Sequence, residues 1–235
     1  MKKPIRTVSI FILLLGCMTS VRAASLQQIL QETQRISHTK NTLDLVWWIP
    51  TQYWTILFKE NPSLTSEQKT QVQKVLEPYL IFAVFRQTIG VFGGAVIPNR
   101  EQVLANITVH ADGHTLKPLK MTKLSPDASN FFLMIKPLLA RSLGQLGTGL
   151  HFIVYPNVKG DRRLIDPLKP GRLECSFFGN TYHWKLPLGC LLPPVYDPKT
   201  NETFPGNYRY NPFTGDPLIR KPHRTSKHLQ RHKVS

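Results

Sequence analysis

The stretch Leu43-Asp-Leu-Val-Trp-Trp-Ile-Pro-Thr-Gln-Tyr-Trp54 carries three of the chain's four tryptophans and has the pattern of a strand that leads directly into a helix. Residues 43–48 are rich in aromatic and branched side chains, which favours a strand that Pro50 ends. Pro50 also suits the start of a helix over 51–59, since its missing N–H would be unpaired there. Adjacent strand residues point to opposite faces, so Trp47 and Trp48 cannot fill the same core. We expect one ring in the main core and the other under the helix or accessible to solvent.

An accessible ring would have a function. Trp47, Trp48, Tyr53 and Trp54 could form a stacking platform for a sugar or a lipid. We favour packing instead, because truncating a buried aromatic side chain costs about 3–5 kcal/mol and a covering helix follows directly in the chain.

The remaining pattern predicts an α+β fold. We expect an antiparallel β-sandwich-like core over 24–192, with three or four interspersed helices and a small C-terminal ribbon-like appendage over 193–218. The helical segments are a short one from 26 to about 36, one from 65 to 77 behind a Thr65/Gln68 capping box, and one over 128–143. Pro137 should kink the last of these or divide it into two shorter helices. The predicted strands cover 80–86, 91–97, 107–110, 150–155, 172–178 and 181–186.

The first 23 residues resemble a signal peptide. Lys2, Lys3 and Arg6 precede an apolar run over 8–15, and Val21-Arg22-Ala23 offers a cleavage site. The run is too short to span a bilayer, so we expect an exported chain of the periplasm or cell envelope without a transmembrane span after cleavage. Leu14-Leu15-Gly16-Cys17 also resembles a lipobox, which leaves lipidation of Cys17 open.

The C-terminal segment 219–235 is strongly basic in a chain of net charge +16. It contains no acidic residue and little apolar content, so we expect it to be disordered. Such a tail could bind anionic lipid, lipopolysaccharide or nucleic acid, or could only aid solubility. Its cations are Arg220, Lys221, Arg224, Lys227, Arg231 and Lys233.

Cys175 and Cys190 are the cysteines that remain after signal cleavage, and an oxidising compartment would permit a disulfide between them. A turn over Gly179-Asn180 places Cys175 opposite Trp184, well before Cys190. The bond would therefore need the chain to fold back after Gly189, and the sequence alone does not decide whether the disulfide forms.

The segment after Pro193-Pro194 repeats a short pattern, Tyr196-Asp-Pro-Lys-Thr and then Tyr210-Asn-Pro-Phe-Thr. It resembles a zinc ribbon in which every ligand has been replaced. Former ligand positions are occupied by Asp197, Thr200, Asn211 and Thr214, whose oxygens cannot replace four thiolates for zinc. Asp197 and Asn211 each precede proline and can bond the backbone two residues on, so we expect Asx-turns to hold the ribbon without a metal or another cofactor.

The order of these motifs, Val-Trp-Trp-Ile-Pro, Phe-Gly-Gly, Leu-Pro-Leu-Gly and the ribbon-like end, resembles a family of exported bacterial proteins without an assigned activity. The resemblance implies a ribbon with cysteines, from which this chain departs. Neither a Gly-x-Ser-x-Gly nor a His-Glu-x-x-His motif occurs, so a hydrolase is the least favoured class. His110 and His114 flank a tight turn, but two histidines without a third ligand are a weak metal signal. We expect a non-catalytic envelope protein that binds another protein or an anionic surface, with nucleic-acid binding as the alternative.

Overall fold

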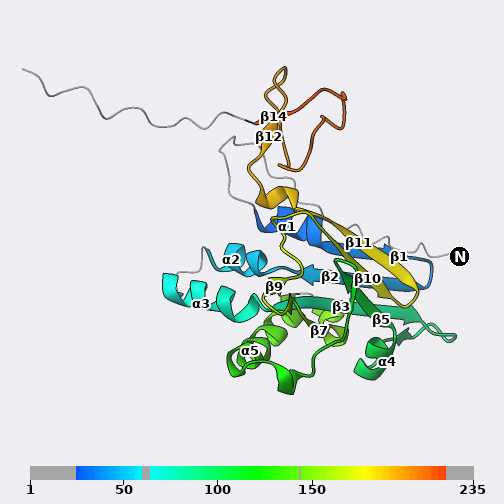
Figure 1. Cartoon of the computed structure of the whole chain (residues 1–235). Helices are drawn as coiled ribbons and strands as arrows, with labels where there is room; N and C mark the ends of the chain where they lie inside the picture. The colour runs from blue at the N-terminus through cyan, green and yellow to red at the C-terminus, as the bar shows by residue number, and fades with distance from the viewer. Residues whose placement is uncertain (1–24, 60–63, 143, 221–235) are drawn as a thin grey trace, which may run out of the picture.

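The computed structural model describes residues 25–59, 64–142 and 144–220, which fold into layers of helices and sheets (Figure 1). The predicted signal peptide, with Cys17, and the basic tail beyond Arg220 lie outside these residues. A group of helices covers one face of a five-stranded sheet, and a four-stranded sheet covers the other face. The expected α+β fold with a sheet-rich core is confirmed.

The middle layer is an antiparallel sheet, which we call sheet A. The β1–β2–β3 ladder is continuous, and β3 pairs on its other side with β7 along residues 79–84 and with β4 at Thr88 and Ile89. Its strands are β1 (Gln34–His38), β2 (Thr42–Ile49), β3 (Tyr79–Ile89), β4 (Ala95–Val96) and β7 (His151–Pro156).

The second sheet, sheet B, is also antiparallel, in the order β11-β10-β5-β6. Alternate residues of β11 are buried and exposed, as expected for a sheet with one solvated face. Its strands are β5 (Ile107–Ala111), β6 (His114–Leu116), β10 (Gly171–Phe177) and β11 (Asn180–Leu186).

The main core lies between the two sheets. Trp48 and Phe82 of sheet A meet Trp184 of sheet B edge to face, with ring centroids 6.3 and 5.6 Å apart. Such contacts add to the stabilisation from apolar burial. Sheets A and B therefore form the expected sandwich.

The helices pack on the opposite face of sheet A. The ring of Trp47, on β2, packs edge to face on that of Tyr53, on α2, with centroids 5.0 Å apart. The rings of Trp54 and of Phe131, on α5, pack in the same way with centroids 4.9 Å apart. The prediction that Trp47 and Trp48 face different cores is confirmed, and it explains why β2 is buried without alternation. The helices of this layer are α1 (Leu26–Thr33), α2 (Thr51–Lys59), α3 (Ser66–Leu76) and α5 (Pro126–Ser142).

Shorter elements connect these layers. They are α4 (Arg100–Ala105), η1 (Met121–Lys123), η2 (Gly144–Gly149), β8 (Val158–Lys159), β9 (Arg162–Arg163) and η3 (Gly189–Leu191). The C-terminal ribbon consists of β12 (Val195–Tyr196), β13 (Thr203–Phe204) and β14 (Ile219–Arg220), and Figure 1 shows it projecting beyond α1. The described residues include no helix long and apolar enough to cross a membrane.

Three local expectations were wrong. The first helix ends at Thr33, and residues 34–38 pair with β2 as a strand. Pro137 does not divide helix α5 into two shorter helices; it lies on the exposed side, where the carbonyl of Leu133 that loses its helical partner can reach water. Residues 91–97 are mostly a hairpin loop, with only Ala95 and Val96 in a strand.

The register of sheet B also differs from the expectation. Phe177 pairs with Asn180, so Cys175 lies opposite Tyr182 and not Trp184. The turn uses Phe178 and Gly179, whose φ angles of 45° and 83° are those of a tight hairpin turn. Cys175 is buried between the sheets, and it and Cys190 are free thiols, so the disulfide does not form in this structure.

Candidate functional site

The ribbon is built from two similar turns that begin at Asp197 and Asn211. The Oδ1 atom of Asp197 accepts a hydrogen bond from the Lys199 amide at 2.8 Å, and that of Asn211 accepts one from the Phe213 amide at 2.9 Å. Each side chain thus closes an Asx-turn two residues on, as the sequence predicts. Thr200 and Thr214 act alike, since each hydroxyl accepts from the amide two residues later at 3.3 Å.

The backbone closes both turns in the same way. The amides of Asp197 and Asn211 donate to the carbonyls of Glu202 and Asp216 at 2.9 and 2.8 Å. The turn then requires a positive φ, which Asn201 supplies in one half and Gly215 in the other. The two halves therefore adopt one conformation with different side chains.

A buried hydrogen bond joins the two turns. The Nδ2 atom of Asn211 donates to Oδ2 of Asp197 at 2.7 Å, and the two residues are 2% and 0% exposed. The bond from Asn211, aided by the Lys199 amide, lowers the pKa of Asp197 below its ordinary value of 3.8. Lys199 of the first turn also pairs with Asp216 of the second at 2.7 Å. Asp197 and Asn211 thus contact each other, while the hydroxyls of Thr200 and Thr214 bond only within their own turns.

Close backbone contact attaches the ribbon to the sandwich. The Gly206 amide donates to the Gly189 carbonyl at 3.0 Å, and a side chain on either glycine would collide with neighbouring atoms. The carboxylate of Glu32, on α1, accepts from the amides of Gly189 and Cys190 at 2.6 and 2.7 Å. Helix α1 and η3 therefore fix the position at which the ribbon begins.

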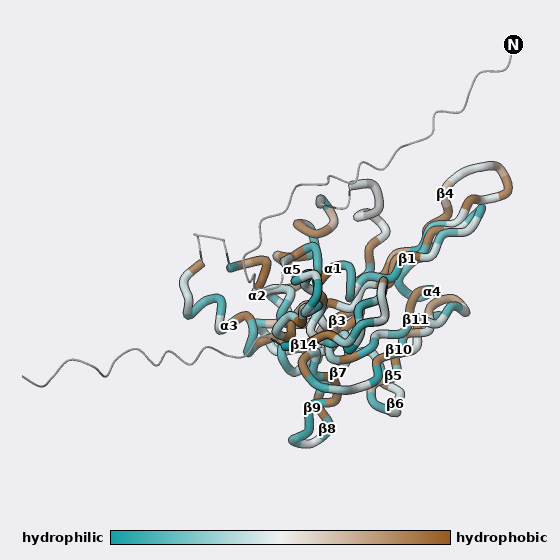
Figure 2. Tube along the Cα trace, turned by 90° about the horizontal axis from the view of Figure 1, so that it is seen from above, coloured by the Kyte–Doolittle hydropathy of each residue, from teal (hydrophilic) through white to brown (hydrophobic). Residues whose placement is uncertain are grey.

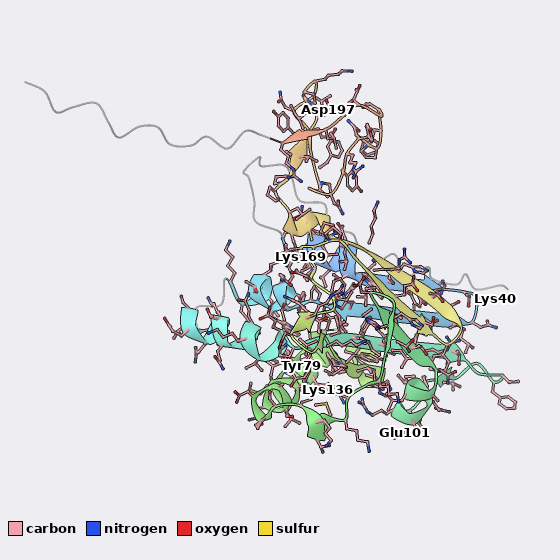
Figure 3. All side chains as sticks on the ribbon, viewed as in Figure 1. Lys40, Tyr79, Glu101, Lys136, Lys169 and Asp197 are labelled. Atoms are coloured by element: carbon pink, nitrogen blue, oxygen red, sulfur yellow. The ribbon has the colours of Figure 1, made fainter. Side chains whose placement is uncertain are left out.

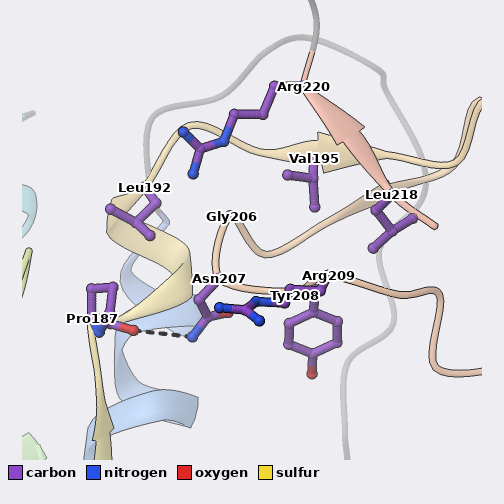
Figure 4. Close-up of a pocket in the computed structure, with 9 residues that line it drawn as sticks. All are labelled: Pro187, Leu192, Val195, Gly206, Asn207, Tyr208, Arg209, Leu218 and Arg220. Atoms are coloured by element: carbon purple, nitrogen blue, oxygen red, sulfur yellow. Dashed lines mark hydrogen bonds between the residues drawn. The ribbon is translucent and has the colours of Figure 1, made fainter. Parts of the chain in front are cut away.

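A pocket of about 370 Å³ opens at this junction (Figure 4). Leu192, Val195 and Leu218 contribute apolar surface to it. Arg209 comes from the loop after β13, and Arg220 from β14. No ion pair engages either guanidinium within the part of the chain that the structure describes. The other lining residues are Pro187, Gly206, Asn207 and Tyr208, and Asn207 is held by a 3.0 Å bond from its Nδ2 to the Pro187 carbonyl.

The aromatic residues considered for a stacking platform lie elsewhere. Trp47, Trp48, Tyr53 and Trp54 are all at most 4% exposed. The Nε1 atom of Trp47 donates to the Thr33 hydroxyl at 3.2 Å within the helix layer. The platform alternative is wrong for these rings, because none offers a face to a ligand.

The free cysteines are poor nucleophiles. Burial raises the pKa of Cys175 to about 12, and burial together with the Glu32 carboxylate raises that of Cys190 to about 12. Both thiols therefore stay protonated near neutral pH.

A second, smaller pocket of about 220 Å³ lies on the outer face of sheet B, lined by His110, Gly113, Arg172 and Glu174. The ring of His110 bonds the Thr115 hydroxyl at 2.9 Å, whereas His114 pairs with Ala111 and so points to the opposite face of the sheet. Over residues 25–59, 64–142 and 144–220, no group of three or more His, Cys, Asp and Glu side chains is placed to hold a metal ion.

Sequence reasoning missed Arg209, Asn207 and Tyr208 as pocket residues. They follow Pro205-Gly206 in a loop without a recognisable motif, and only the close approach of Gly206 to η3 brings them to the sandwich. Of the predicted tail cations only Arg220 is described, and it lines the same pocket. The chain matches no protein-family model, no curated protein and no solved structure in the comparisons made. The family resemblance therefore stays a prediction.

Proposed function

We propose that this chain is a non-catalytic, exported protein of the cell envelope that binds an anionic group carrying an apolar portion. One observation carries the proposal: Arg209 and Arg220 line the same pocket as the apolar side chains of Leu192, Val195 and Leu218. A guanidinium binds a carboxylate or phosphate through parallel hydrogen bonds, so both arginines favour an anionic group in this pocket. The apolar surface would contact the hydrocarbon next to that group.

The size of the pocket fits a small ligand or the end of a chain. Ligand pockets in proteins commonly have volumes of about 300–1,000 Å³ and combine apolar surface with a few polar groups. At about 370 Å³, this one lies near the lower end of that range. Its residues are positioned by the Gly189–Gly206 contact and by the Asn207 bond to Pro187, which favours binding without a large rearrangement.

Octanoate and octanol form a matched pair of probes for this pocket. We expect octanoate to shift the backbone amide resonances of Gly206 and Asn207, and octanol, which lacks the charge, to bind at least about tenfold more weakly. Arg209→Gln and Arg220→Gln should each weaken octanoate binding by about tenfold, because each removes a charged donor. Arg162→Gln is the control, since Arg162 is an exposed cation paired with Asp112, outside the residues that line the pocket.

The proposal fails if octanoate leaves these amides unchanged. It also fails if both arginine variants bind octanoate as the natural chain does.

Nucleic-acid binding is the second candidate, favoured by the position of Arg220 where the basic segment begins. A phosphodiester would bind to the same guanidinium groups, those of Arg209 and Arg220. An oligonucleotide that displaced octanoate, with an affinity falling steeply as salt increases, would support this candidate over the first.

A further inference from the structure

The most exposed apolar side chains of the described chain stand at the end of one hairpin. Strands β3 and β4 are joined by Gly90-Val-Phe-Gly-Gly94, and the side chains of Val91 and Phe92 are 99% and 103% exposed. Figure 2 shows this hairpin projecting from the body, with hydrophobic residues near its end. Large apolar residues exposed together in this way indicate an interaction site.

The loop has a defined shape. The Gly93 amide donates to the Gly90 carbonyl at 2.9 Å, and the Gly90 amide donates to the Gly94 carbonyl at 2.8 Å. Gly93 has a φ of 81°, which a residue with a side chain rarely adopts. These bonds satisfy polar groups of the loop backbone internally, which lowers the cost of moving the loop into an apolar medium.

Apolar side chains occupy both faces of the hairpin as well as its tip. Ile89 pairs with Ala95 and Thr88 with Val96, so Ile89 and Val96 point to opposite faces. They are 51% and 53% exposed. A flat protein interface would cover one face, whereas lipid acyl chains would surround the tip on every side.

The charge around the hairpin favours an anionic surface. The Ile89 amide donates to the Asn41 carbonyl at 2.8 Å, which places the β1–β2 turn with the exposed Lys40 beside the hairpin (Figure 3). Neither residues 34–43 nor 87–100 contain an acidic side chain. The chain carries a net charge of +16, or +12 after loss of Lys2, Lys3, Arg6 and Arg22 with the expected signal peptide, and this charge matches an anionic lipid surface.

We propose that the β3–β4 hairpin inserts the side chains of Val91 and Phe92 into the apolar layer of an anionic lipid bilayer, with Lys40 at the headgroups. This surface involves none of the residues of the ribbon pocket, so it does not depend on the proposed function. Apolar residues that enter the headgroup and acyl boundary, with cations beside them, are a known mode of peripheral membrane binding.

The buried natural tryptophans make a specific test feasible. All four are at most 2% exposed, so Phe92→Trp adds a single accessible indole at the tip. We expect vesicles of phosphatidylglycerol and phosphatidylcholine with brominated acyl chains to quench this added fluorescence. Quenching at residue 92 requires this residue itself to reach the acyl chains, and an indole placed elsewhere on the body separates it from vesicle contact by the ends of the chain. Lys40→Gln should raise the lipid concentration needed for half-maximal quenching by about threefold to tenfold, because it removes a cation at the headgroups.

Met134→Trp is the matched control. Met134 is a 66% exposed apolar residue on α5, and the account predicts that an indole there stays unquenched. Near-ultraviolet circular dichroism from the buried tryptophans confirms that each variant folds. An indole at position 92 that is not quenched by brominated lipid overturns the proposal. In that case the exposed hairpin would be a site for a protein partner and not for lipid. Equal quenching at positions 92 and 134 also overturns it, because it would indicate unspecific adsorption.

Discussion

At the residue scale, Thr33 connects the two cores. Its hydroxyl accepts from Nε1 of Trp47 at 3.2 Å and donates to the Ile29 carbonyl at 2.6 Å, and its carbonyl accepts from Nε1 of Trp184 at 2.8 Å. Trp47 belongs to the helix layer and Trp184 to the core between the sheets. One residue at the end of α1 therefore satisfies the polar atoms of two buried tryptophans.

Thr33→Val should lower the free energy of unfolding by about 1–3 kcal/mol, because it leaves the indole N–H of Trp47 buried without an acceptor. Denaturant unfolding followed by tryptophan fluorescence measures this loss. Thr70→Val is the control, since Thr70 makes the same bond to the carbonyl four residues earlier but is exposed on α3. Equal losses in the two variants would show that the indole bond contributes nothing.

At the element scale, the segments that could be predicted were those with a strong local pattern. β2 and α2 were predicted because aromatic residues such as Trp47 and Trp48 are typical of a strand, and Pro50 marks where the strand ends and the helix begins. β1 was missed because its apolar content is low and its strand state depends on pairing with β2. The turn at Phe178 was misplaced by one residue because a phenylalanine rarely adopts a positive φ, and here its ring packs over the guanidinium of Arg86 at 4.5 Å.

The ribbon should unfold before the sandwich on acidification. Hydrogen bonds from Asn211 and Lys199 lower the pKa values of Asp197 and Asp216, so their contribution is present above the ordinary value of 3.8 and is lost as the pH falls through the lowered values. Burial raises the pKa of Asp44 in the sandwich, so protonation of this carboxylate removes the cost of burying its charge.

Amide hydrogen exchange between about pH 5 and pH 2 should show protection at Gly215 decreasing before protection at Leu173. Asp197→Asn should remove much of this dependence, because the side chain then cannot be protonated in that range. Simultaneous loss of protection at Gly215 and Leu173 would contradict the prediction that the ribbon unfolds before the sandwich.

The whole molecule consists of a sandwich with tryptophans buried in both of its cores and a ribbon whose turns are closed by side-chain hydrogen bonds. The sandwich and the Asx-turns could be predicted from residue types alone. The pocket could not, because it depends on the close approach of Gly189 and Gly206 and on the two bonds from Glu32. Contacts between segments far apart in the chain leave no local pattern.

The Asp197–Asn211 bond joins the two turns of the ribbon, and we predict that the ribbon and its pocket therefore form without an ion. The most direct test is amide hydrogen exchange at Asn211 and Gly215 before and after exhaustive treatment with a chelator. The account predicts unchanged protection at both amides, and predicts that Asn211→Leu removes it while Leu173 in sheet B stays protected. Exchange at the rate of an unfolded peptide in the chelated natural chain would contradict the claim.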